Sequence, residues 1–277
     1  MTSPELDAWL AQNPRHAGAL LRAQATLAMF APPAQADVVA PTKQWRWPLL
    51  GGFALAAAGL AGVLVYDPDA QTYATDVGDM RMVTLAEGSS LALDTQTKLR
   101  VDMDRDARVV RLDEGRALLR VRHDAARPFR VRAGDVTITD IGTVFQVVRR
   151  GDAVTVLVSE GLVEVKAPTG TMRLSAGQMA SFGPQATGPQ PMSPAAIERA
   201  TAWTSGKIDL DGERLDTAID EMNRHNRLKI TLATPALGAE RLYGAFRLDD
   251  PAGFARTAAM GIGARTQDRD ATIEIAK

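Results

Sequence analysis

One long uncharged stretch sets how this chain relates to a membrane. No charged residue occurs from Trp47 to Tyr66, and residues 49–66 read LLGGFALAAAGLAGVLVY. Twenty residues of α-helix span ~30 Å, about the thickness of the hydrocarbon core of a bilayer. Trp45 and Trp47 at one end and Tyr66 at the other suit the two membrane interfaces. We therefore predict one transmembrane helix over residues 47–66.

Two other structures fit this stretch less well. A buried core helix of this length normally keeps a polar face, which this stretch lacks. The apolar part of a cleaved secretory signal follows a short basic leader, whereas 46 residues precede the stretch here. Lys43 and Arg46 precede the stretch, whereas Asp67 and Asp69 follow it. The positive-inside rule then predicts a single-pass protein with its N-terminus in the cytoplasm. In a bacterium the membrane would be the inner membrane, and the C-terminus would lie in the periplasm.

The rest of the composition excludes several function classes. The 277 residues carry a formal net charge of -1, without the basic excess of proteins that bind nucleic acid directly. Cysteine is absent, which excludes disulfides, thiolate metal sites and thiol nucleophiles. His16, His123 and His225 lie in three separate segments, so no metal site, cofactor or Ser-His-Asp triad is predicted. We interpret His225 as a polar cap at the end of a helix.

Residues 1–46 predict two short amphipathic helices followed by a proline-rich linker. The apolar side chains of the two helical stripes are Leu6, Trp9, Leu10, Leu20, Leu21 and Leu27. Helices this short cannot bury both stripes by themselves. The pair therefore either closes as a hairpin, on itself or against the membrane surface, or offers an apolar face to another protein.

Beyond the uncharged stretch, apolar residues alternate with a period of two from about residue 75 to 183. Leu91 and Leu93 are one such run, typical of a short strand. Glycine-containing turn signals, Glu114-Gly115 among them, separate the runs. We predict an all-β domain over residues 75–183, either a sandwich or a short β-solenoid.

Two further segments complete the chain. Residues 184–202 begin with a run rich in Pro and Gly, and we interpret them as a linker. In residues 203–277, strand and helix patterns alternate. Leu215, Ala218 and Met222 fall at helical spacing, and Asp250-Pro251 is typical of a helix start. These residues predict a small α/β module built from two βαβ-type units.

Six segments of the β region resemble the FecR family of bacterial transmembrane sigma-factor regulators, also called anti-sigma factors. They read LAEGSSLALDTQTKLRV (85–101), LDEGRALLRV (112–121), RPFRVRAG (127–134), IGTVFQV (141–147), VTVLVSEGLVEV (154–165) and LSAGQ (174–178). Residues 203–277 resemble the short module shared by secretins and TonB-dependent receptors, and residues 6–24 are similar to the family's cytoplasmic helices. Arg116 and Leu119 depart from the family pattern, and we expect them to alter packing detail only.

The resemblance implies cell-surface signalling. Family members bind an extracytoplasmic-function (ECF) sigma factor through their cytoplasmic helices, which assigns the six stripe residues to sigma binding. They sense the N-terminal signalling domain of a TonB-dependent receptor in the periplasm, commonly for siderophore or haem uptake and thus iron transport. This assigns receptor binding to the segment from Trp203 to Lys277, without singling out residues within it.

Two further points follow from the same resemblance. Intramembrane and periplasmic proteases release the cytoplasmic fragment of family members, which implies regulated proteolysis of this chain. The alternative is a membrane-tethered periplasmic scaffold that docks to an outer-membrane assembly without a sigma partner.

Some family members cleave themselves at a Gly-Thr bond, which Gly142-Thr143 matches in this chain. The resemblance implies that the threonine hydroxyl attacks the preceding carbonyl and that water opens the resulting ester. The other interpretation of this pair is a tight turn at the start of a strand. No enzymatic activity on another molecule is predicted.

Overall fold

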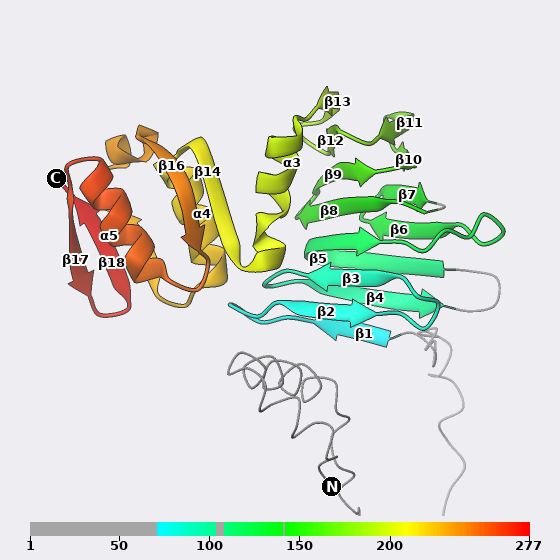
Figure 1. The fold of residues 1–277 in the computed structure, drawn as a ribbon, viewed down its shortest axis with the longest axis horizontal. Helices are drawn as coiled ribbons and strands as arrows, with labels where there is room; N and C mark the ends of the chain where they lie inside the picture. Colours follow the sequence, from blue (N-terminus) through cyan, green and yellow to red (C-terminus); the bar gives the residue numbers. More distant parts are fainter. Residues whose placement is uncertain (1–70, 104–107, 141) are drawn as a thin grey trace, which may run out of the picture. The chain divides into compact units, whose positions relative to one another are not determined.

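The computed structural model describes residues 71–103, 108–140 and 142–277. The predicted transmembrane stretch and cytoplasmic helices lie outside these residues. Within the described part, no helix is both long enough and apolar enough to cross a membrane. The described residues form an all-β domain followed by a small α/β module (Figure 1).

The β domain is one continuous 13-stranded sheet folded into two halves, which we call sheet A and sheet B. Its strands are β1 (Gln71–Ala74), β2 (Arg81–Thr84), β3 (Ser90–Leu93), β4 (Lys98–Met103), β5 (Arg108–Arg120), β6 (Phe129–Ala133), β7 (Val136–Asp140), β8 (Val144–Arg150), β9 (Ala153–Glu160), β10 (Leu162–Ala167), β11 (Gly170–Ser175), β12 (Gln178–Phe182) and β13 (Thr187–Pro191). Sheet A has the order β1-β4-β5-β6-β7-β10-β11, and sheet B has the order β2-β3-β5-β8-β9-β12-β13.

Strand β5 belongs to both sheets because it bends in the middle. Residues 108–114 pair in sheet A, and residues 115–120 pair with β3 and β8 in sheet B. At the bend, Gly115 has φ +100°, and a Cβ there would lie 2.5 Å from Cα of Thr97. Glu114-Gly115 is thus a bend within a strand, and its prediction as a turn between strands is wrong. Glycine serves both purposes because positive φ costs it little.

The alternation of apolar residues is confirmed as the inward face of both sheets. A single buried cluster contains Phe129 and Ile138 of sheet A together with Leu91 and Phe145 of sheet B. The packing is therefore that of a sandwich. The chain also passes repeatedly from one sheet to the other, with hairpins between the passages, so its path is solenoid-like. Both predicted alternatives describe part of the architecture.

Residues 184–202, interpreted from composition as a linker, are ordered instead. They contain strand β13, which pairs with β12, and helix α3 (Pro194–Thr201), and the 3-10 helix η1 (Ala202–Ser205) continues from it. Ser193 caps α3 by accepting a hydrogen bond from the Ala196 N–H. Every residue of β13 is exposed, and α3 has no buried residue. The sequence of residues 184–202 therefore has no apolar pattern that would have predicted β13 or α3, although the backbone there is regular.

The C-terminal module places two helices between two small sheets (Figure 1). Its elements are β14 (Lys207–Arg214), α4 (Leu215–His225), β15 (Lys229–Leu232), η2 (Pro235–Ala239), β16 (Arg241–Arg247), α5 (Pro251–Gly261), β17 (Arg265–Arg269) and β18 (Thr272–Ala276). Strands β14 and β16 pair antiparallel, and β15-β18-β17 form the second sheet. The two predicted strand–helix–strand units are present.

The module packs directly on sheet B. Its buried cluster, which includes Trp203, Met222 and Phe254, also contains Ala92 of β3, and Leu118 of β5 packs against it. Because Leu91 and Leu93 point into the sandwich, Ala92 points out of the opposite face. The outer face of sheet B therefore forms one wall of the module's core.

Candidate functional site

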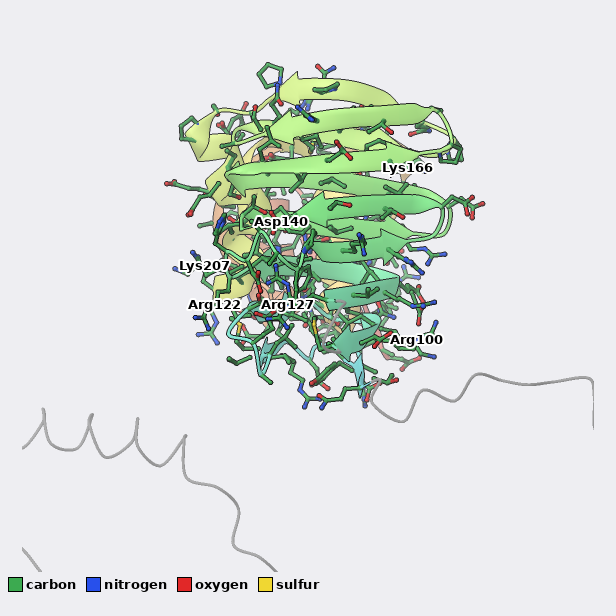
Figure 2. The ribbon with its side chains drawn as sticks, turned by 90° about the vertical axis from the view of Figure 1, so that its right-hand side faces the viewer. Arg100, Arg122, Arg127, Asp140, Lys166 and Lys207 are labelled. Atoms are coloured by element: carbon green, nitrogen blue, oxygen red, sulfur yellow. The ribbon has the colours of Figure 1, made fainter. Side chains whose placement is uncertain are left out.

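The Gly142-Thr143 pair lies in a passage from sheet A to sheet B, between β7 and β8. The neighbouring passages stack on it: the Val121 N–H donates to the Thr143 carbonyl at 2.9 Å, and the Thr143 side chain lies beside Gly161. Figure 2 places Asp140, at the end of β7, on the same side of the sandwich as Arg122 and Arg127, with Arg100 on the opposite side. The Gly142-Thr143 pair thus lies within a stack of tight connections between sheet A and sheet B.

The geometry of this passage is specific for glycine followed by a buried hydroxyl. Gly142 has φ +148°, and a Cβ there would lie 2.8 Å from Nδ1 of His123. Its N–H donates to Asp140 Oδ1 at 2.9 Å. Thr143 is 4% exposed, and its Oγ1 has no hydrogen-bond partner among the described residues. A buried hydroxyl without a hydrogen-bond partner is energetically costly.

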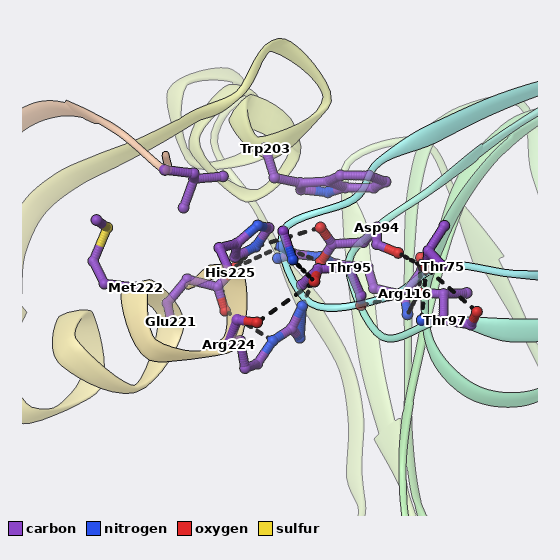
Figure 3. Close-up of polar contacts among 12 residues, drawn as sticks. Thr75, Asp94, Thr95, Thr97, Arg116, Trp203, Glu221, Met222, Arg224 and His225 are labelled. Atoms are coloured by element: carbon purple, nitrogen blue, oxygen red, sulfur yellow. Dashed lines mark hydrogen bonds and ion pairs between the residues drawn. The ribbon is translucent and has the colours of Figure 1, made fainter. Parts of the chain in front are cut away.

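A second arrangement, which we call the charge cluster, joins the β domain to the module. It consists of Asp94, Arg116, Glu221, Arg224 and His225 (Figure 3). Asp94 follows β3 and its side chain is fully buried. Arg116 Nε donates to Asp94 Oδ2 at 2.7 Å, and Arg224 donates to the same oxygen from the module.

Glu221 is the second carboxylate of the charge cluster and comes from helix α4. Arg116 donates to Glu221 Oε1 at 2.5 Å, and the more exposed Arg150 lies 3.5 Å from Glu221 Oε2. Burial alone would raise the pKa of Glu221, but the hydrogen bond from His225 and the charges of Arg116 and Arg224 lower it well below its usual value. Glu221 is therefore ionised at neutral pH.

Aromatic and amide groups extend the contact. Trp203 is 3% exposed, and its Nε1 donates to Gln146 Oε1 of β8 at 2.6 Å. The Arg116 guanidinium lies over the indole ring, 4.8 Å from its centroid. Arg116 thus touches Asp94, Glu221 and Trp203 at once, which suits its planar, multi-donor side chain.

Asp94, Glu221 and His225 offer three ligand atoms within 4.8 Å of one another, a spacing that a metal ion could use. His225 Nε2 lies 3.3 Å from Asp94 Oδ1 and 3.4 Å from Glu221 Oε1. However, Arg116, Arg150 and Arg224 already contact these two carboxylates. Three guanidinium charges against two carboxylates would repel a further dication. The donor set fits an ion-pair network better than a metal centre.

The charge cluster corrects two sequence interpretations. Arg116, expected to alter packing detail only, bridges the two domains. His225, interpreted as a polar helix cap, is buried against Asp94, whereas the capping group at this helix end is Asn226, whose Nδ2 donates to the Met222 carbonyl. Asp94, Glu221 and Arg224 were not identified from the sequence. The one available signal was the spacing of Glu221 and His225, four residues apart on one helix face.

The cytoplasmic candidates fall outside the part of the chain that the structure describes. They are the predicted sigma-binding residues Leu6, Trp9, Leu10, Leu20, Leu21 and Leu27. Their assignment to sigma binding therefore stays a prediction.

The predicted receptor-binding segment, from Trp203 to Lys277, has two different ends. Trp203 lies within η1 and is buried against sheet B, so the ordered structure begins before this segment and Trp203 itself offers no free surface. Lys277 is exposed, and its Nζ lies 3.0 Å from Glu240 Oε1, an ion pair within the module. The assignment of receptor binding to this segment stays a prediction.

An open strand edge lies between these two ends. Strand β16 pairs only with β14 among the described strands, which leaves its other edge open. Tyr243 of β16 is 69% exposed. This edge is one surface of the module to which a further strand could be added.

The arrangement is that of a β-sandwich with an attached α/β module, and comparisons place it among known proteins. Residues 71–164 match the family model described as FecR protein. Two crystal structures described as a "putative anti-sigma factor" from Parabacteroides distasonis ATCC 8503 share the fold. Their TM-scores are 0.63 and 0.64, and their sequence identities are 23% and 22%. Each covers 75% of this chain and 99% of its own chain.

At these identities the two crystal structures show the fold alone. The shared fold covers more of the chain than the family match over residues 71–164. No curated protein matches the chain. The family match shows that the β domain is FecR-like over residues 71–164.

Proposed function

We propose that this protein is an inner-membrane regulator of an ECF sigma factor and relays a signal from a TonB-dependent outer-membrane receptor, such as one for siderophore or haem uptake. The FecR match over residues 71–164 carries the proposal. The fold shared with the two crystal structures described as anti-sigma factors supports it. The predicted span over residues 47–66 would anchor the chain, and regulated proteolysis there would release the cytoplasmic part.

The sigma partnership is tested by co-purification of the full chain with the ECF sigma factors of its own organism. We expect a complex that Leu20→Asp weakens, because a charge would interrupt the predicted apolar stripe. Gln12→Asp, on a residue outside both stripes, is the control. If the full chain binds no such sigma factor, the scaffold alternative is favoured.

We propose the open edge of β16 as the surface that meets the receptor's N-terminal signalling domain. Arg241 and Arg247 flank the exposed Tyr243, so an extended segment with acidic ends would suit it. Tyr243→Asp should abolish binding in titration calorimetry of the full chain with that domain. Leu162→Asp, at a 48% exposed position on β10, should leave binding unchanged. Equal binding by both variants would exclude the β16 edge.

The buried Thr143 hydroxyl favours a second candidate activity, self-cleavage at Gly142-Thr143. Thr143 Oγ1 would attack the Gly142 carbonyl carbon, the peptide C–N bond would break, and the hydroxyl proton would pass to the freed amine. Water would then hydrolyse the ester, leaving a carboxylate on Gly142 and the hydroxyl on Thr143. The positive φ of Gly142 and the unpartnered hydroxyl support this proposal.

Self-cleavage predicts two fragments, one that ends at Gly142 and one that begins at Thr143. Thr143→Ala should stay intact, whereas Thr143→Ser, which keeps a hydroxyl, should still be cleaved. Intact-mass spectrometry of the purified chain after prolonged incubation distinguishes these outcomes. An uncleaved wild-type chain would leave the pair as a tight turn.

A further inference from the structure

We propose that the charge cluster is a latch between the β domain and the module, and that opening it passes a receptor-binding event at the module to the β domain. This inference rests on the proposed function, which assigns the module to the receptor. The latch itself is argued from contacts that do not depend on that assignment.

The contacts across the junction converge on two carboxylates. Three arginine–carboxylate ion pairs and the contact of His225 with Asp94 join the β domain to the module within the described residues, and each has Asp94 or Glu221 as its acid. Arg116 bonds to Asp94 of its own domain and to Glu221 of the module, 105 residues away in sequence. Loss of either carboxylate would leave the largely buried Arg116 with one carboxylate partner instead of two.

Such a junction has two distinct states. When the module is docked, Asp94 is fully buried, Arg116, Glu221 and Arg224 are largely buried, and these charged groups contact one another. When it is undocked, water would solvate all of them, which offsets much of the attraction lost. The junction also has an apolar part, because Ala92 of sheet B belongs to the buried cluster that contains Trp203, and Leu118 packs against that cluster. No described strand of the β domain pairs with a strand of the module, so opening the junction would leave the hydrogen-bonded sheets of both domains intact.

The chain has no cysteine, so two introduced cysteines can be labelled uniquely. Leu162→Cys on β10 and Met260→Cys on α5 replace side chains that are 48% and 75% exposed. Spin labels there report the distance between the domains in the full chain, reconstituted in nanodiscs. We expect one narrow distance distribution, which Arg116→Gln and Glu221→Gln should each abolish. An unchanged distribution in both variants would overturn the latch.

The matched control is Arg100→Gln. It removes an ion pair with Asp113, 3.1 Å long and partly exposed, that lies wholly within the β domain. This variant should keep the narrow distribution. Circular dichroism checks that each variant is folded. If Arg116→Gln is not folded, the distance distribution of Glu221→Gln decides whether the latch exists, because Glu221 lies on a helix surface and is partly exposed.

The relay is tested separately with a sigma-dependent transcriptional reporter. Glu221→Gln should change reporter output in the absence of the receptor's substrate, and Arg100→Gln should not. Normal induction by a variant whose domains have separated would overturn the relay while leaving the latch intact. If the unsubstituted chain supports no receptor-dependent output, the proposed function fails, and the distance measurements still decide the latch.

Discussion

At the scale of single residues, the junction depends on directional contacts that a similar side chain would not reproduce. The Trp203 indole N–H satisfies the buried Gln146 amide, and the Arg116 cation lies over the ring of the same residue. A hydrogen bond between buried groups contributes modestly to stability, but leaving one partner unsatisfied costs more. Trp203 therefore contributes through its nitrogen as well as its apolar area.

Trp203→Phe tests this contribution. It keeps an aromatic ring under Arg116 but leaves Gln146 Oε1 without its donor. We expect the free energy of unfolding of the module-bearing part to fall by about 1–3 kcal/mol. Pulse proteolysis of the full chain in urea measures it. Tyr243→Phe, at an exposed position, should leave stability within about 0.5 kcal/mol, and an equally small effect of Trp203→Phe would show that the hydrogen bond contributes little.

At the scale of elements, local sequence signals explain most helix and strand positions. Asp250 and Pro251 start α5 as predicted, with the Gly253 N–H donating to Asp250 Oδ1 at 2.8 Å. Alternation located the buried strands because their inner side chains repeat every second residue. It failed for β13, whose side chains are all exposed and whose strand form depends on pairing with β12.

Asp250→Ala should loosen the start of α5. The substitution removes the side-chain acceptor of the first helical turn, which typically costs about 1 kcal/mol. Amide hydrogen exchange in residues 252–255 should become faster, while exchange in α4 stays unchanged. Asp268→Ala, on an exposed residue of β17, is the matched control. Equal exchange rates in both variants would contradict the cap.

At the scale of the whole molecule, one carboxylate connects stability of the junction to pH. The pKa of Glu221 is lowered because the hydrogen bond from His225 and the Arg116 and Arg224 charges outweigh burial. The facing groups are Asp94, Arg116 and Arg150 of the β domain and Arg224 and His225 of the module. The docked state thus binds a proton on Glu221 more weakly than the undocked state.

The sign of the pH dependence follows. The contribution of Glu221 to docking is fully present above its ordinary pKa of 4.5 and is lost as pH falls toward its lowered pKa in the docked state. The distribution of distances between the spin labels should therefore stay narrow at neutral pH and broaden below about pH 4.5. In Glu221→Gln, which has no carboxyl group at this position, the acid-induced broadening caused by protonation of Glu221 should disappear. A distribution that narrows on acidification would contradict the assignment.

The sequence by itself determined what depends on near neighbours: the apolar periodicities, the turn glycines, the start of α5 and the uncharged stretch at residues 47–66. Only the tertiary structure decided the order of the strands and the role of Arg116, His225 and Asp94. Arg224 and Asp94 are 130 residues apart and carry charges that look solvated in the sequence. The energy of a charge depends on what buries it and what faces it, and those neighbours are brought together only when the module packs on sheet B.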